Sequence, residues 1–255
     1  MCVSWPEEYG GRGLTGIEVA VMNEEFARAG VPRVTRGMGE WLVGPSIIVH
    51  GSEEQKAKFL PRIISGKDRY CQGFSEPDAG SDLAGLKTRG VVDGEEIVIT
   101  GQKVWTSGAQ MANMMFCLCR TDPDAPKHQG ISYVLLPMKT ADGESNGIEL
   151  RPLRQITGNS GFTETFLTEA RAPLSNVIGG LNNGWRVTMT TPSPENFSPG
   201  CPETSHHTVG RMSSDIDTDL PTSELDRSNL LDVLRRTMEA AGVHGHGKVP
   251  ADGQV

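Results

Sequence analysis

The sequence predicts an α+β fold, in which an N-terminal helical segment leads into a β-sandwich or β-barrel middle domain. Apolar residues recur at helical spacing through about the first seventy residues, and from Tyr70 onward turn residues separate short apolar runs. Helices and strands do not alternate, so no parallel βαβ architecture is indicated. We expect a partial helical domain over residues 1–69, a β-domain over 70–180 and a tail over 181–255.

Two capping patterns mark where the expected helices begin. Thr15 and Glu18 have the spacing of a capping box ahead of a helical apolar stripe, and Ser52 with Gln55 repeats that spacing. Between them, an apolar stretch over residues 41–49 is interpreted as a further helix. The helices are expected to end at glycines, namely Gly30, Gly51 and Gly66.

The middle of the chain reads as a series of short strands. The segment VVDGEEIVITG predicts a hairpin with Asp93-Gly94 as its two-residue turn. In the run NMMFCLCR, Cys117 and Cys119 lie two residues apart, so we expect them to share one strand face and pack as small apolar side chains. Further strands are expected in QKVWTS (102–107), NMMFCLCR (113–120), ISYVLLP (131–137), IELRPL (148–153) and ETFLTEA (164–170).

The composition limits the possible function classes. The 255-residue chain has a formal net charge of -8 and a pI of about 5.3, which argues against nucleic acid or an anionic membrane as its main partner. No apolar run approaches the length of a membrane span, and the start MCVSWPEEYGG lacks the pattern of a signal peptide. The five cysteines include no CxxC pair, so we interpret the protein as reduced and cytoplasmic.

The segment QGFSEPDAGSDLAGL, residues 72–86, places three carboxylates among Pro and Gly residues that prevent a long helix. Such a loop is either a solvated connection or a scaffold that aims backbone N–H groups at a ligand. Beyond it, residues 192–221 are rich in Pro, Ser and Thr and are expected to form a linker. One helix is predicted after the linker, beginning at Ser223 and ending at Gly242.

Four ordered segments give the chain a family resemblance. They are WPEEYGGRGL (5–14), HGSEEQKAKFLPRIISGK (50–67), QGFSEPDAGS (72–81) and GQKVWTSGA (101–109). With these motifs the chain resembles the acyl-CoA dehydrogenase family over roughly residues 5–191. Family members have more helical sequence before Trp5 and a helical bundle after the β-domain. We therefore expect that bundle to be absent here, and a truncated or frame-shifted gene product is one hypothesis.

The resemblance implies an FAD-dependent oxidation of an acyl-CoA thioester to the 2-enoyl-CoA, with electrons passing to an electron-transfer flavoprotein. The family's catalytic Glu lies in the bundle, so no catalytic base is assigned and the isolated chain is expected to be impaired. The alternative is a non-catalytic subunit or degenerate fragment that completes a flavin site in a homo- or hetero-oligomer with a family member. The resemblance implies that Ser81 also reaches substrate and that the flavin is lined by Gln72, Phe74, Ser75, Gly80, Ser81, Trp105, Thr106 and Ser107.

The side chains of the two motifs have further expected roles. Glu76 and Asp82 are expected to cap backbone N–H groups or to pair with basic residues, rather than to catalyse. On a strand, Trp105 and Ser107 would point to one face and Thr106 to the other. Taken alone, the acidic loop is equally well interpreted as a solvated turn, and Trp105 is better interpreted as a core residue.

Metal and other carboxylate sites are weaker interpretations. The pairs His206-His207 and His244-x-His246 have no second ligand cluster nearby in the sequence, so no metal is expected. The acidic residues of the 72–86 loop lie too close together for the opposed geometry of a glycosidase or calcium site.

Overall fold

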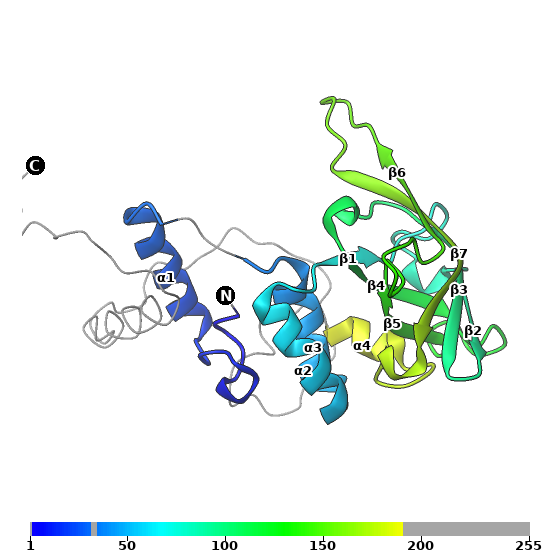
Figure 1. Ribbon diagram of the computed structural model, residues 1–255, viewed down its shortest axis with the longest axis horizontal. Helices are drawn as coiled ribbons and strands as arrows, with labels where there is room; N and C mark the ends of the chain where they lie inside the picture. The colour runs from blue at the N-terminus through cyan, green and yellow to red at the C-terminus, as the bar shows by residue number, and fades with distance from the viewer. Residues whose placement is uncertain (1, 32–34, 191–255) are drawn as a thin grey trace, which may run out of the picture.

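A computed structural model describes residues 2–31 and 35–190 of the chain (Figure 1). The helices are α1 (Gly16–Arg28), α2 (Gly44–His50), α3 (Glu53–Ser65) and α4 (Gly184–Thr190). The strands are β1 (Tyr70–Gly73), β2 (Arg89–Asp93), β3 (Glu96–Lys103), β4 (Met114–Arg120), β5 (Ile131–Pro137), β6 (Ile148–Leu153), β7 (Phe162–Pro173) and β8 (Val177–Ile178). Figure 1 shows helices α1 to α3 on one side and the strands on the other, with α4 between them.

The N-terminal helices begin where the capping patterns indicate. Both predicted capping boxes are complete, since each cap side chain accepts the backbone N–H three residues on, and the cap's own backbone N–H donates to the side chain of that residue. A π-helical turn over Gly39–Val43 continues directly into α2, which ends at Gly51 as expected. Helix α3 passes through Pro61 and ends at Gly66, whose φ of +73° is the left-handed conformation that favours glycine.

The strands form one sheet in the order β6-β7-β3-β2-β4-β5-β8, and β1 pairs with β4 in parallel off this path. Strands β2 and β4 are joined only through the pair Arg89–Arg120. Because this junction is so short, the sheet folds over at it, and β3 and β7 share an apolar core with β4 and β5. The β-sandwich prediction is thereby confirmed.

Strand β4 is buried on both faces, which explains its unbroken apolar sequence. Met115, Cys117 and Cys119 enter the core shared with β3 and β7, whereas Phe116 and Leu118 pack in the core shared with α2 and α3. Cys117 and Cys119 therefore lie on one face and pack as small apolar side chains, as predicted. Burial raises the pKa of the Cys117 thiol to about 11, which keeps it protonated.

The hairpin prediction is right, but its turn is wrong by one residue. Asp93 pairs with Glu96, so the two-residue turn is Gly94-Glu95. Asp93 stays in the ladder because its carboxylate and that of Glu96 both bind the Arg171 guanidinium, at 3.1 and 3.0 Å. Gly94 then supplies the positive φ, +62°, at the first turn position.

The described residues include only the start of the predicted tail, residues 181–190. Helix α4 lies in the expected tail and packs against β5 and α2, and it is the last element in the described residues. The predicted linker, the helix from Ser223 and the four histidines of the two pairs lie outside the described residues.

Residues 2–31 and 35–190 contain neither a membrane-spanning helix nor a cluster of metal ligands. Within those ranges, no helix is long and apolar enough to cross a bilayer. The same ranges contain no group of three His, Cys, Asp or Glu side chains placed to hold a metal ion.

Candidate functional site

The acidic loop starts where β1 ends and closes on itself in a tight turn. β1 lies so close to β4 that a Cβ on Gly73 would be only 2.5 Å from the Met115 sulfur, so glycine is needed at this position. After it, Glu76 and Ala79 exchange two backbone N–H···O bonds, at 3.0 and 3.1 Å. Pro77 lies at the tip of this turn, so the turn is fixed by main-chain bonds and by the restricted φ of proline.

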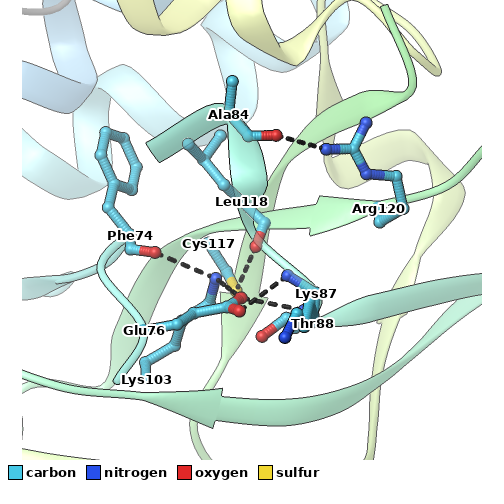
Figure 2. Close-up of polar contacts among 9 residues, drawn as sticks. All are labelled: Phe74, Glu76, Ala84, Lys87, Thr88, Lys103, Cys117, Leu118 and Arg120. Atoms are coloured by element: carbon cyan, nitrogen blue, oxygen red, sulfur yellow. Dashed lines mark hydrogen bonds and ion pairs between the residues drawn. The ribbon is translucent and has the colours of Figure 1, made fainter. Parts of the chain in front are cut away.

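Glu76 is the anchor of the loop (Figure 2). Its Oε2 accepts the backbone N–H of Lys87 at 2.7 Å, and its Oε1 accepts that of Thr88 at 2.9 Å and the Lys103 ammonium at 2.9 Å. Burial by itself raises the pKa of Glu76, but the Lys103 charge and these hydrogen bonds outweigh it and hold the pKa below its ordinary 4.5. The carboxylate is therefore a structural cap, as predicted, and not a proton acceptor for catalysis.

The other two carboxylates of the loop face outward and pair with lysines. Asp82 binds the Lys127 ammonium at 2.5 Å, and Asp78 lies 3.6 Å from that of Lys87. These pairs are exposed, so each contributes little to stability. The three carboxylates do not repel one another strongly, because each has a cationic or N–H partner; the expected pairing of Asp82 with a basic residue is confirmed.

Trp105 lies beside the acidic loop, although not on a strand. β3 ends at Lys103, so the expected strand through Ser107 is wrong, and with it the expectation that Trp105 and Ser107 share a strand face. The reason is the left-handed backbone of Trp105, with φ of +60°, which breaks the extended conformation. Just before it, the Val104 N–H donates to the Ser75 carbonyl at 2.9 Å and joins the two motifs.

The indole of Trp105 is 60% exposed and packs edge-to-face on Phe162, with ring centroids 5.8 Å apart. A left-handed conformation of a bulky residue costs free energy, and such strained residues cluster at functional sites. The exposed indole gives this part of the β-domain an aromatic surface on which a flat ligand can stack.

The remaining predicted site residues differ in exposure. Phe74 is buried, and its ring packs against Phe116 and Tyr133, so it anchors the start of the loop in the core. Thr106 is also buried; its N–H donates to the Thr163 carbonyl, and its hydroxyl accepts a bond from Thr165. The other residues keep some exposure: Gln72, Ser75 and Ser107 are partly exposed, and Gly80 and Ser81 are exposed.

The polar side chains at this surface fit a ligand with a polar edge. Within the described part of the chain, no hydrogen bond engages the hydroxyls of Ser75, Ser81 or Ser107. Flavins present carbonyl and ring-nitrogen acceptors on one edge and an extended flat face. Hydroxyl donors without a partner in the described residues, on the two segments that the Val104–Ser75 bond joins, are of the type that an isoalloxazine ring requires.

Lys103 is the site residue that reading the sequence missed. It is wholly buried and binds both Glu76 and the Phe74 carbonyl. A signal was available: Lys103 falls on the same two-residue register as the inward-facing Ile97 and Ile99. A lysine on the inward face of a strand indicates a buried acidic partner.

Comparisons with known proteins show the family of the two domains. Residues 1–67 match the family described as acyl-CoA dehydrogenase, N-terminal domain, and residues 71–169 match its middle domain. The acyl-CoA dehydrogenase IpdE1 of Mycobacterium tuberculosis is 44% identical over 190 residues, covering 74% of this chain and 48% of that protein. FadE34 of the same organism is 48% identical over 187 residues, covering 73% of this chain and 25% of FadE34.

Solved structures give the same result. The structure described as the Tcur3481-Tcur3483 steroid ACAD has a TM-score of 0.66 and 42% identity, covering 76% of this chain and 48% of that one. The ChsE4-ChsE5 complex from Mycobacterium tuberculosis has a TM-score of 0.64 and 36% identity, covering 74% and 47%. The chain spans about half the length of IpdE1 and of both solved chains. It carries the N-terminal and middle domains of an acyl-CoA dehydrogenase and belongs to that family.

Proposed function

We propose that this chain supplies the β-domain part of an FAD site in an enzyme that oxidises an acyl-CoA thioester to the 2-enoyl-CoA. The observation that carries the proposal is the hydrogen bond from Val104 N–H to the Ser75 carbonyl, which joins the acidic loop to the segment that carries the exposed indole of Trp105. The electron acceptor is proposed to be an electron-transfer flavoprotein, as the family membership suggests.

The residues of this site have distinct proposed roles. Trp105 provides the stacking surface, and the hydroxyls of Ser75 and Ser107 donate to the polar edge of the flavin. Gln72, Phe74 and Thr106 are proposed to line the same flavin site, and the buried side chains of Phe74 and Thr106 also hold the loop and the tryptophan segment in place. When bound, FAD supplies the acceptor for the hydride that leaves the β-carbon of the acyl group.

Ser81 is the residue proposed to contact substrate. It is exposed at the far end of the loop, next to Asp82, whose carboxylate is held by Lys127. A serine hydroxyl at this position can donate to a thioester or amide oxygen of an acyl-CoA. Gly80, also exposed, leaves room for the ligand because a Cβ there would have no heavy atom within 4 Å.

A second proposal is that the site is completed by another chain. Two similar solved structures each name a pair of proteins, ChsE4-ChsE5 and Tcur3481-Tcur3483. By analogy, this chain would provide half of a flavin site, and a family member in a homo- or hetero-oligomer would provide the catalytic base. An oriented base contributes about 10²–10⁴-fold in rate, so the chain alone would be a poor enzyme.

The decisive experiment is a titration of the purified chain with FAD, followed by the flavin absorption spectrum. We expect a resolved, shifted spectrum with saturation at micromolar FAD, and weaker binding for Ser107→Ala. Ser65→Ala, at the end of α3, is the matched control and should bind as the unchanged chain does. Absence of any spectral change at tens of micromolar FAD would contradict the flavin proposal.

Co-expression with a full-length family member separates the two proposals. Activity with acyl-CoA that appears only in the co-purified complex supports the partner proposal. Activity of the chain by itself supports the first proposal without a partner.

A further inference from the structure

Lys103 and Glu76 form an ion pair deep beneath the proposed flavin surface. Lys103 is 0% exposed and Glu76 is 7% exposed. The Lys103 ammonium donates to Glu76 Oε1 at 2.9 Å and to the Phe74 carbonyl at 3.1 Å. Figure 2 shows the ammonium reaching both acceptors, while the Phe74 ring points away from it. Both bonds of a single lysine therefore end on one three-residue stretch of the acidic loop.

Stability alone does not explain this pair. Taking two charges out of water costs about as much as their attraction returns, and replacing a buried ion pair by apolar side chains is often neutral or stabilising. Apolar neighbours surround the pair, since Cys117 lies near Lys103 and belongs to the core that β3 and β7 share with β4 and β5. An apolar pair would thus hold the two layers together equally well.

What the ion pair adds is position. Glu76 follows Ser75 directly, and Lys103 precedes Trp105 by two residues. Together with the bond from Val104 N–H to the Ser75 carbonyl, the pair connects the loop and the tryptophan segment at two adjacent places. Two connections fix the orientation of Ser75 against Trp105 more tightly than the Val104–Ser75 bond would alone.

The bond to Phe74 has a second consequence for Ser75. The Phe74 carbonyl and the Ser75 N–H belong to the same peptide group. A cationic donor on the carbonyl oxygen polarises that group, and polarised peptides are stronger donors at their N–H. Lys103 therefore affects both the place of Ser75 and the strength of its backbone donor.

We propose that Lys103 and Glu76 are positioning residues, whose ion pair fixes Ser75 against Trp105 and strengthens the Ser75 N–H as a donor to the flavin. This inference rests on the proposed function for the identity of the ligand. The positioning itself is a property of the chain without ligand, and it can be measured there.

The test uses the full chain and the double variant Glu76→Gln/Lys103→Met, which removes both charges and nearly keeps both shapes. Lys103→Met alone leaves a buried carboxylate without its cation and should lower Tm clearly. The double variant should recover a Tm within about 5 °C of the unchanged chain. Its amides at residues 74–76 should nevertheless exchange hydrogen about tenfold faster without flavin, and its Kd for FAD should be about tenfold higher.

Asp68→Asn is the matched control. Asp68 is 1% exposed and is bound by both Nε and Nη2 of Arg62 at 2.8 and 2.7 Å, outside the acidic loop. This variant should lose stability while keeping the exchange rates at 74–76 and the affinity for FAD. Such a pattern would show that general destabilisation does not produce the loop effect.

The outcomes are distinct. A double variant with unchanged exchange at residues 74–76 overturns the inference, whether or not FAD binds. If the unchanged chain takes up no FAD, the proposed function fails, and the exchange rates still decide whether the pair holds the loop. If the double variant does not fold, Glu76→Gln alone, which keeps the side-chain shape, is judged by the same exchange measurement.

Discussion

Replacing Trp105 tests the left-handed backbone conformation that ends the strand β3 region and presents the indole at the candidate site. At 60% exposure, roughly two-fifths of a side chain of about 250 Å² is buried, or about 100 Å². At about 25 cal/mol per Å² that burial is worth about 2.5 kcal/mol. The edge-to-face contact with Phe162 adds about 0.5–1.5 kcal/mol, so removing the indole should cost about 3 kcal/mol.

The backbone makes alanine and glycine unequal at this position. A φ of +60° costs an L-residue about 1–2 kcal/mol and costs glycine nothing, while glycine loses about 0.5–1 kcal/mol through the entropy of the unfolded chain. Trp105→Gly should therefore be more stable than Trp105→Ala by about 0.5–1 kcal/mol. The measurement is urea unfolding of the flavin-free chain followed by circular dichroism, compared through the midpoints.

Met111 offers the control for this comparison. It is also exposed, and its φ is not positive. Met111→Ala should be more stable than Met111→Gly, by about 0.5–1 kcal/mol, which is the ordinary order. If Trp105→Ala proves as stable as Trp105→Gly, while Met111 shows the ordinary order, the left-handed conformation is refuted.

Three further changes follow from single contacts. Gly44→Ala should lower Tm and cost about 2 kcal/mol or more, because the new Cβ would lie 1.9 Å from Cζ2 of Trp5; a Tm at or above that of the unchanged chain would contradict this packing. Ser52→Ala should cost about 1 kcal/mol in urea unfolding by removing the cap of α3, whereas Ser65→Ala in the same helix should change it by less than about 0.5 kcal/mol. Because the folded pKa of Glu76 is lowered, the stability that its ionised carboxylate contributes is complete above pH 4.5 and is lost as the pH falls through the folded pKa. When unfolding midpoints are measured against pH, those of Glu76→Gln should therefore fall less steeply on acidification than those of the unchanged chain. Equal slopes would argue against the lowered pKa.

Local sequence signals predicted most of the secondary structure. Capping boxes at Thr15 and Ser52 are formed by side chains reaching three residues along the same chain, so no distant contact is needed to recognise them. The strands were visible for a similar reason, since turn residues punctuate them and apolar side chains fill them. The hairpin turn was misplaced by one residue because Arg171, far away in sequence, binds the carboxylates of Asp93 and Glu96.

The roles of the acidic residues were partly predictable. Carboxylates packed into a Pro/Gly loop require donors nearby, which is why capping and pairing were expected for Glu76 and Asp82. Their partners were not predictable, because Lys103 and Lys127 come from segments 27 and 45 residues away. The strand expected through Ser107 failed because the φ of Trp105 is set by bonds to Ser75 and Thr163 on either side of it, not by its own strand propensity.

The amino-acid sequence by itself determined the order of helices and strands, the two motifs of the candidate site and the family to which the chain belongs. All of these depend on residues close together in the chain or on motifs in a fixed order. Only the tertiary structure decided that Lys103 is buried against Glu76 of the acidic loop and that Trp105, whose indole is exposed, follows a main-chain bond to Ser75. Both depend on segments that meet only after the sheet folds over, and the free energy of such contacts has no signature within a short stretch of sequence.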